Sequence, residues 1–495
     1  MSSGEHEGPR TYGNWRRPSA AGFGQLSFAA SMGVLVAMIL MVLVYALAGP
    51  LWSTLVGAVS AGAIWAISVK DRHGISLADR MGETMRFWRA SRKKENIYRS
   101  GPLAPASVAS GHCMLPGVLS ASTLSSQVDS YDRPFALIRH ADGSLAVVLK
   151  VAPSGADLLD TEHVDLQVAY WGQWLADLGG ELGIVGASVC VETSPDTGSR
   201  LDREVTRRMS PDAPDLARQI MREVVEEYKA GSAQVRTWIT VVFDPARMGA
   251  KRRQFDQAAR DIGTRLPGLT QTLVAAGAGA VHLMTVDEVV RLVRVAYDPA
   301  CEELFEDAAA AGEEVHVSWG DAGPVTAHAQ WDTYVHDSGR SRSWVVSAPP
   351  RGVVQSSILR TILSANADVA RKRVTILYRP MDAGKAPGVV EADLNKARAR
   401  VETMGRPTAR SLNELHAAQQ VAAEEAAGAG LVDFGMVITA TTMSEDMEDT
   451  SSAVTALAAA SRLQVRLAYG AQDSAFALGL PVGVRPTGQR LGGAL

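Results

Sequence analysis

The stretch PSAAGFGQLSFAASMGVLVAMILMVLVYALAGPLWSTLVGAVSAGAIWAISV, from Pro18 to Val69, contains no Asp, Glu, Lys or Arg. The hydrocarbon layer of a bilayer is roughly 30 Å thick and needs about 20 apolar residues of helix to cross it, so this stretch has room for two crossings. Gly49-Pro50 is its only sharp break. The sequence therefore predicts a transmembrane helical hairpin over residues 23–69, with one span from Phe23 to Ala48 and a second from Leu51 to Val69.

Two other interpretations of this stretch are a cleaved signal peptide and a helical hairpin buried in a protein core. The apolar region of a signal peptide has about 7–15 residues, whereas the first span is longer and a second follows without a cleavage-like spacer. Small residues also recur at every fourth position, which lets two helices approach closely in lipid. They are Ala29, Gly33 and Ala37 in the first span and Ser53, Gly57 and Ala61 in the second. A general abundance of Ala and Gly explains this spacing equally well.

Basic residues flank the hairpin on both sides, and the turn between its arms is uncharged. By the positive-inside rule, both chain termini are then cytoplasmic and the turn is outside. We therefore expect a multi-pass protein of the cell membrane, with residues 1–22 as a cytoplasmic amino-terminal tail and almost all of the remaining chain in the cytoplasm.

Residues 70–99 predict a basic amphipathic helix next to the membrane. Its apolar face is formed by Leu77, Met81, Met85 and Trp88, at intervals of three and four. The other face is strongly basic, which suits a helix lying on an anionic leaflet. The residues that we assign to the membrane surface are Arg86, Arg89, Arg92, Lys93 and Lys94. The alternative is an ordinary helix that packs on the folded domain and whose basic end stops membrane transfer.

The rest of the chain predicts an α+β fold with two related cytoplasmic α/β sandwich modules. Residues 100–130, rich in Ser, Pro, Gly and Ala, are typical of a linker. The first module spans residues 131–310 and the second residues 311–495. Each opens with a β-hairpin followed by helices and strands, and the openings share letters, such as Tyr131-Asp132 and Trp331-Asp332. This repetition favours an internal duplication.

The expected elements follow from hydrophobic periodicity and from Gly and Pro breaks. The expected strands cover 135–140, 145–151, 184–192, 235–243, 331–336, 343–347, 373–379, 434–442 and 463–468. The expected helices include 162–178, 215–228, 286–297, 353–363, 451–461 and a long region over 389–427 that is broken near residue 405.

The charge of the chain argues against nucleic-acid binding, and its cysteines indicate a reducing compartment. The net charge is only −4, so the basic residues after the hairpin are a local feature. A nucleic-acid-binding protein concentrates Lys and Arg across its folded domain, and we therefore expect no direct nucleic-acid binding. Cys113, Cys190 and Cys301 form no Cys-x-x-Cys pair and fit a reducing compartment.

No segment matches the phosphate-binding motif Gly-x-x-x-x-Gly-Lys-Ser/Thr. The nearest is Gly384-Lys385, but Arg379 stands at the first Gly position and Ala386 at the hydroxyl position. The phosphate cradle and the magnesium ligand are both missing, so the chain should not hydrolyse ATP. Gly277-Ala278-Gly279 lacks the third Gly of a dinucleotide fingerprint and indicates a loop.

An acidic stretch, Glu445 to Asp449, follows the expected strand 434–442. Carboxylates at the end of such a strand can hold Mg²⁺ or Mn²⁺ beside a sugar nucleotide, as in many glycosyltransferases. The simpler interpretation is that these acids favour the positive amino end of the next helix, expected to begin at Ser451. We adopt it and assign no catalytic residue, no cofactor-binding residue and no metal ligand.

Short motifs along the chain are similar to those of an actinobacterial family. The motifs are Tyr12-Gly13-Asn14-Trp15-Arg16, Tyr98-Arg99-Ser100-Gly101-Pro102, Tyr131-Asp132-Arg133-Pro134-Phe135, Val295-Ala296-Tyr297-Asp298-Pro299, Trp331-Asp332 and Asp433-Phe434-Gly435. With the two close spans and the basic flank, they resemble two-span membrane proteins carrying an EccE-like domain, as in the EccE component of type VII secretion. The resemblance implies a non-enzymatic, membrane-anchored structural subunit of a bacterial envelope secretion machine.

A second resemblance concerns Ala471-Gln472-Asp473-Ser474-Ala475-Phe476 and Leu480-Pro481-Val482-Gly483. They look like the segment that closes the non-catalytic front module of conjugative type IV secretion ATPases, which are sometimes fused to a two-span subunit. This implies the alternative of a type IV subunit that docks a cytoplasmic ATPase. The expected partners are a lipid bilayer, other membrane subunits and such an ATPase, within a multi-subunit complex. A membrane-tethered glycosyltransferase-like enzyme is the rival class.

Overall fold

The computed structural model describes residues 28–486, apart from 70, 72, 102–113, 154, 156–158, 197, 211, 232, 250–254, 351–353 and 404–405. The predicted tail 1–22, Phe23 and Cys113 therefore lie outside the described residues.

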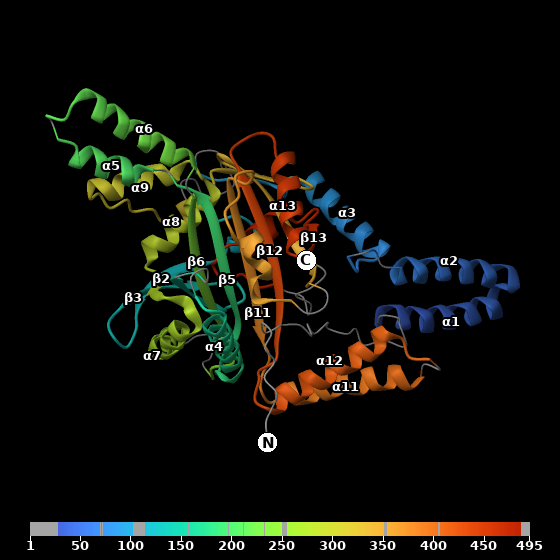
Figure 1. Cartoon of the computed structure of the whole chain (residues 1–495). Coiled ribbons are helices and arrows are strands. Elements are labelled where there is room, and N and C mark those ends of the chain that lie inside the picture. The colour runs from blue at the N-terminus through green and yellow to red at the C-terminus, as the bar shows by residue number, and fades with distance from the viewer. Residues whose placement is uncertain are drawn as a thin grey trace, which may run out of the picture.

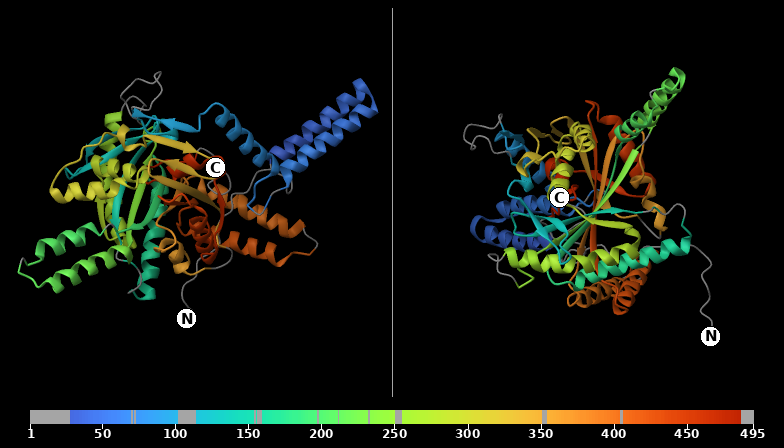
Figure 2. Two further views of the ribbon diagram at one scale, coloured as in Figure 1. Left: turned by 90° about the horizontal axis from the view of Figure 1, so that it is seen from above. Right: turned by 90° about the vertical axis from the view of Figure 1, so that its left-hand side faces the viewer.

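Helices α1 (Phe28–Ala48) and α2 (Pro50–Ser68) lie side by side and project from the body (Figures 1 and 2). The predicted break at Gly49-Pro50 is confirmed, because Gly49 has a φ of 85° and Pro50 begins α2. Glycine adopts this left-handed region without steric penalty, and proline is well suited to the first turn of a helix.

The prediction of a transmembrane hairpin is wrong. Within the part of the chain that the structure describes, no helix is long and apolar enough to cross a membrane. The spans expected to end at Ala48 and Val69 are corrected accordingly. The expectation of a multi-pass membrane protein with two cytoplasmic termini is corrected with them.

The described strands form one antiparallel sheet of 13 strands. Its order is β1-β8-β9-β10-β12-β11-β5-β6-β4-β3-β2, while β7 pairs with β4 and β13 pairs with β10. The strands are β1 (Ile97–Arg99), β2 (Thr123–Val128), β3 (Pro134–Arg139), β4 (Leu145–Ala152), β5 (Ile184–Pro195), β6 (Ala233–Phe243), β7 (Ala280–Leu283), β8 (Thr326–Ala329), β9 (Tyr334–His336), β10 (Gly339–Ala348), β11 (Arg371–Pro380), β12 (Val432–Thr442) and β13 (Gln464–Leu467).

The two halves of the sheet have the same arrangement. In the first half the order is β4-β6-β5 with β7 paired to β4, and in the second it is β10-β12-β11 with β13 paired to β10. The halves meet where β5 and β11 pair from Thr193↔Lys372 to Ala187↔Tyr378. The fold class of two separate sandwiches is therefore corrected to one α/β body with a large antiparallel sheet. The physical reason is that each half would otherwise leave a long apolar strand as an unpaired edge.

Strand β4 shows how the sequence separates the two faces of the sheet. Leu145, Val147 and Leu149 point to one face and Ala146 and Val148 to the other, because side chains alternate along a strand. All five are buried. The first set packs in a core with α4 (Thr161–Gly180) and α7 (Phe255–Leu273), and the second set in a core with α8 (Val286–Tyr297) and α14 (Gln472–Leu478).

The second half buries the same face of the sheet under different helices. Val374 and Tyr378 lie on one side of β11, since they are four residues apart. Tyr378 packs against the core under α4 and α7, while Val374 belongs to a core under α10 (Arg360–Leu363) and α13 (Glu448–Ala460).

The remaining helices lie at the periphery (Figure 1). They are α3 (Leu77–Arg92), α5 (Ser199–Arg208), α6 (Asp215–Gly231), α9 (Cys301–Ala311), α11 (Ala386–Thr403) and α12 (Ala409–Ala426). The pairs α5–α6 and α11–α12 leave the sheet at equivalent places, after β5 and after β11. Together with α1–α2 they make three helical arms that extend from one sheet-based body.

Candidate functional site

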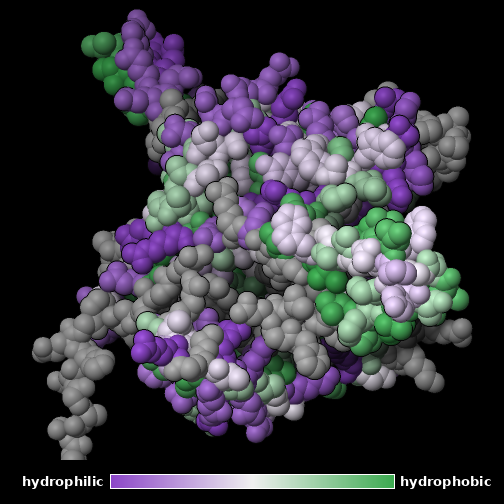
Figure 3. Space-filling model, turned by 90° about the vertical axis from the view of Figure 1, so that its right-hand side faces the viewer, coloured by the Kyte–Doolittle hydropathy of each residue, from purple (hydrophilic) through white to green (hydrophobic). Residues whose placement is uncertain are grey.

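The arm formed by α1 and α2 exposes apolar side chains along its length. Leu47 and Leu51, on either side of the turn, are 79% and 84% exposed. Other exposed large apolar residues of the arm are Leu35, Val36, Met38, Ile39, Leu40, Val42, Leu43, Tyr45, Trp52, Leu55, Val59 and Trp65. Figure 3 looks onto the side from which this arm projects and shows hydrophobic residues gathered beside hydrophilic ones. Soluble monomers rarely expose apolar patches of this kind, and such patches mark interaction sites.

The contact between α1 and α2 uses the small residues that the sequence indicates. Ser53 Oγ donates a hydrogen bond to the carbonyl oxygen of Met41 at 3.0 Å. A Cβ atom at Gly57 would lie 3.0 Å from Met41 Cε, and one at Gly33 would lie 3.9 Å from Ile64. Gly33, Ser53 and Gly57 thus lie in the contact between α1 and α2, where they meet Ile64 and Met41 and not each other. Large apolar side chains elsewhere on both helices are exposed.

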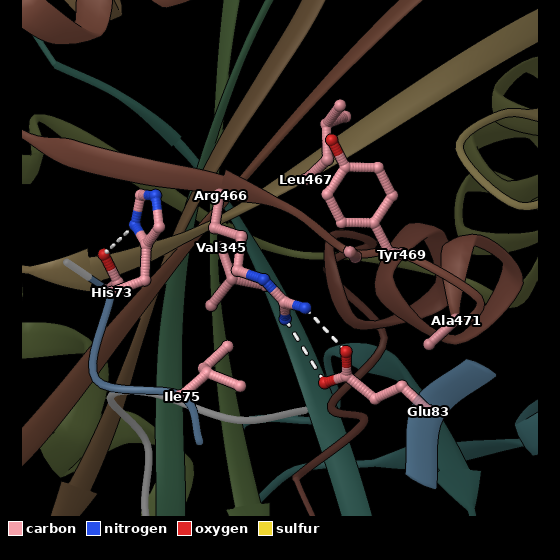
Figure 4. Close-up of a pocket in the computed structure, with 10 residues that line it drawn as sticks. His73, Ile75, Glu83, Val345, Arg466, Leu467, Tyr469 and Ala471 are labelled. Carbon is pink, nitrogen blue, oxygen red and sulfur yellow. Dashed lines mark hydrogen bonds and ion pairs between the residues drawn. The ribbon is translucent and has the colours of Figure 1, made fainter. Parts of the chain in front are cut away.

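Helix α3 joins this arm to the body through its inner face. Glu83 accepts two hydrogen bonds from Arg466 of β13, at 2.6 and 3.3 Å, and Phe87 packs edge-on against Trp331. Before the helix, His73 Nδ1 lies 3.0 Å from Ser347 Oγ. Figure 4 shows the small cavity beside Glu83 and Arg466. Its volume of about 20 Å³ has room for little more than one water molecule, so this contact is a joint between two elements.

The basic residues assigned to a membrane surface lie on α3 and just after it. Arg86, Arg89, Arg92, Lys93 and Lys94 are all exposed. The Arg92 guanidinium stacks 3.7 Å above the Trp88 ring, and Lys93 lies 3.7 Å from Glu95.

The acidic stretch lies at the start of α13, which begins at Glu448 and not at Ser451. Glu448 forms an ion pair with Arg342 at 2.7 Å, and Glu445 lies 3.7 Å from Arg340. Asp446 Oδ1 accepts a hydrogen bond from the Glu448 amide, at the amino end of the helix. Across the described ranges, no group of three His, Cys, Asp or Glu side chains is arranged to hold a metal ion.

The Gly384-Lys385 segment forms a turn that leads into α11. Asp382 Oδ1 accepts a hydrogen bond from the Gly384 amide at 3.0 Å, and the Asp382 carbonyl accepts one from the Lys385 amide at 2.9 Å. The Gly384 amide is therefore already hydrogen-bonded to the Asp382 carboxylate. A phosphate-binding loop would need this amide to donate to the phosphate instead.

A buried ionic network at the centre of the sheet is the main polar feature that the sequence reasoning missed. Arg371 of β11 contacts Glu192 of β5 at 3.0 Å and also pairs with Glu302 of α9. Arg236 of β6 contacts the other oxygen of Glu302 at 2.6 Å. Burial raises the pKa of Glu302, but the two arginines outweigh it and hold that pKa below the usual value. The network therefore joins the two halves of the molecule by charge.

Arg373 lies two residues farther along β11 on the same face and is fully buried. Its Nε lies 3.5 Å from Glu192 Oε2, while its two Nη atoms have no hydrogen-bond partner among the described residues. The guanidinium sits 4.8 Å from the Phe476 ring of α14. Burial lowers the pKa of Arg373. The run Arg371-Lys372-Arg373 at the start of an apolar strand is the sequence signal that could have indicated buried charge.

The segment after β13 crosses both halves of the sheet. We call residues 472–485, from Gln472 to Arg485, the closing segment. In the second half, Gln472 Oε1 accepts a hydrogen bond from the Ser343 amide at 2.8 Å, and Thr375 Oγ1 donates to the Gly479 carbonyl at 2.7 Å. It therefore begins against β10 and β11.

The closing segment then reaches the first half. Thr240 Oγ1 donates a hydrogen bond to the Pro481 carbonyl at 3.0 Å, and His140 Nε2 donates to the Val482 carbonyl at 2.9 Å. Arg485 ends the crossing with an ion pair to Asp142 at 2.8 Å. Burial would raise the pKa of Asp142, but hydrogen bonds from Ser144 and Arg485 lower it to about 2.

The described residues thus present an outward-facing apolar arm, a basic helix beside it and a body whose two halves share one sheet. Comparison with known protein families and with curated proteins found no match to this chain.

Proposed function

We propose that this chain is a non-enzymatic structural subunit of a multi-subunit bacterial secretion or transfer machine. The observation that carries the proposal is the α1–α2 arm, whose apolar side chains point outward along both helices. Burial of apolar surface stabilises by roughly 25 cal/mol per Å², so an arm of this kind gains much free energy when apolar helices of other subunits cover it.

The body supports the same role. The β5–β11 pairing, the ionic network and the closing segment hold both halves in one piece. A scaffold needs a rigid core of this kind to keep its docking arms at fixed distances. The resemblance of short motifs to the EccE-like family favours a type VII machine. The closing segment favours, as the alternative, the docking half of a type IV system that binds a cytoplasmic ATPase.

Site-specific photo-crosslinking in the native cell tests the proposal. A photoreactive amino acid replaces Leu51, the most exposed apolar residue near the tip of the arm. We expect one or a few discrete protein adducts, identified by mass spectrometry as subunits of the same machine.

Met443 provides a matched control position, because it is also a large apolar residue and is 65% exposed on the body. A probe there should give none of these adducts. Identical adducts at both positions, or no protein adduct at Leu51, would show that the arm does not bind other subunits.

A further inference from the structure

We propose that the outward face of α3 binds the surface of an anionic lipid bilayer without crossing it. This inference is independent of the proposed function, because it concerns a different helix and a different chemistry from the protein-binding arm.

The outward face of α3 carries a continuous apolar stripe. Leu77, Met81, Met85 and Trp88 are 38%, 67%, 50% and 51% exposed. Residues three and four apart share one side of a helix, so these four side chains form a single line. Glu83 and Phe87 hold the opposite side of the helix against Arg466 and Trp331. The stripe therefore cannot turn inward while the joint is intact.

The exposed surface of α3 that flanks this stripe is basic and lacks compensating acids. Both acids of α3 are used elsewhere, since Asp79 completes the capping box with Ser76 and Glu83 pairs with Arg466. Arg86, Arg89 and Arg92 have no acidic partner within the described part of the chain, and Lys94 follows at the end of the helix. An anionic surface would supply the missing negative charge.

The pairing of Arg92 with Trp88 favours lipid over an acidic protein. Trp and Met in a shallow stripe fit the boundary between headgroups and acyl chains, where the flanking arginines reach the phosphate level. Lipid phosphates are mobile and can meet arginines at any spacing, whereas an acidic protein helix would need carboxylates at matching positions. The face belongs to a single helix, and the cavity of about 20 Å³ beside Glu83 and Arg466 is far too small to hold a partner helix.

Vesicle flotation with the purified full chain tests the proposal. The vesicles contain either phosphatidylcholine alone or phosphatidylcholine mixed with phosphatidylglycerol. The test variant is the triple change Arg86→Glu, Arg89→Glu and Arg92→Glu. We expect wild-type binding to the mixed vesicles, weakening with added salt, and a loss in the triple variant on the order of 100-fold or more.

The matched control carries the same change in charge at the opposite end of the molecule, on the arm α5–α6 (Figure 1). It combines Arg207→Glu, Arg208→Glu and Arg222→Glu, all at exposed positions. It should keep wild-type binding. An equal loss in both triple variants would mean that net charge alone drives binding, and equal wild-type binding to both kinds of vesicle would mean that the apolar arm does. Either result overturns the proposal.

A second readout locates the helix. Brominated lipids quench tryptophan fluorescence on contact, so vesicles that contain them should quench wild type more than Trp88→Phe. Equal quenching of the two proteins would place Trp88 away from the bilayer and overturn the proposal. The proposal would also be overturned if the wild type did not bind vesicles and the α3 triple variant lost a protein partner. That pair of results would identify an acidic protein as the ligand of this face.

Discussion

At the scale of single residues, the buried charges at the junction explain how two halves behave as one body. Moving an unpaired charge out of water costs several kcal/mol, so buried ions persist only with good partners. Arg371 has two carboxylate partners, Glu192 and Glu302, and both lie within the predicted first module, residues 131–310. Separation of the halves would leave Arg371, Glu192 and Glu302 without these contacts. The network therefore stabilises the joined state, because separating the halves would break these buried ion pairs.

Replacing Glu302 by Gln tests this reasoning. The change leaves Arg371 and Arg236 each short of one charged partner in a site where Glu302 is 5% exposed. We expect a loss of about 3–5 kcal/mol in the free energy of unfolding, measured by urea denaturation at neutral pH. The control is Glu414→Gln, which breaks the ion pair with Arg400 where both side chains are 47% exposed, and should cost at most about 1 kcal/mol.

The sign of the pH effect follows from the lowered pKa of Glu302. Its charged form is favoured in the folded state, so its contribution is fully present above the ordinary glutamate pKa of about 4.5 and is lost as the pH falls through the lower folded value. Glu302→Gln should therefore reduce the acid sensitivity of the protein below about pH 4.5. Similar small losses for both Gln variants would show that the network does not hold the halves together.

Sequence reasoning reached some of these residues and not others, for a physical reason. Local rules predicted the break at Gly49-Pro50, because the conformational preferences of these two residues decide it within one short segment. Glu192, Arg236, Glu302 and Arg371 lie far apart in the sequence. The pairing of β5 with β6 and with β11, and the position of α9 beside these strands, bring them together. The hydrophobic periodicity of one strand or helix carries no information about contacts between residues on different elements.

At the scale of elements, the long apolar strands were predictable and short connecting pieces were not. The expected strands 184–192, 235–243 and 434–442 all lie within observed strands, since buried runs of β-branched residues favour this conformation. The expected helix 353–363 is reduced to a 3₁₀ turn at Ser356–Leu359 and the four residues of α10. Ile362 of α10 is buried against the sheet, so tertiary packing decides the shape of this connection.

Replacing Gly483 by Ala tests whether the closing segment packs tightly on the first half of the sheet. The φ of Gly483 is 81°, and a Cβ atom there would lie 2.4 Å from Ala146 Cβ on β4. Gly483→Ala should therefore carry two costs, the left-handed backbone and the clash, and should lower stability by about 2–5 kcal/mol in thermal unfolding.

Gly428 separates these two costs. Its φ is 96°, and nothing lies within 4 Å of the position that a Cβ atom would take. Gly428→Ala should carry the backbone cost alone, about 1–2 kcal/mol. Equal losses of stability in the two variants would show that the closing segment shifts to make room for the added Cβ atom. The segment would then not hold the two halves of the sheet together.

At the scale of the whole molecule, the repeated order of elements has produced one sheet from two units. The sequence showed the repetition through the similar openings of the two predicted modules. It did not show that the end strands β5 and β11 of the two half-sheets pair with each other, because any exposed apolar strand edge could instead be covered by a helix or by another chain. Strand β1, which precedes the first unit, also pairs with β8 of the second. The halves are thus linked at the sheet centre and at its edge.

Cutting the chain after Gly312, in the exposed connection that follows α9, tests whether these links suffice without a covalent bond. We expect fragments 1–312 and 313–495 to co-purify when they are expressed together and to unfold in one cooperative transition. Each fragment alone should lack such a transition, because its end strand, β5 or β11, loses the partner that satisfies its backbone groups. Shortening the second fragment to 313–471 removes the closing segment and should weaken the pairing, since the contacts to Thr240, His140 and Asp142 are lost. Cooperative unfolding of either fragment by itself would instead mean that each half is an independent domain, and that the pairing of β5 with β11 only places them side by side.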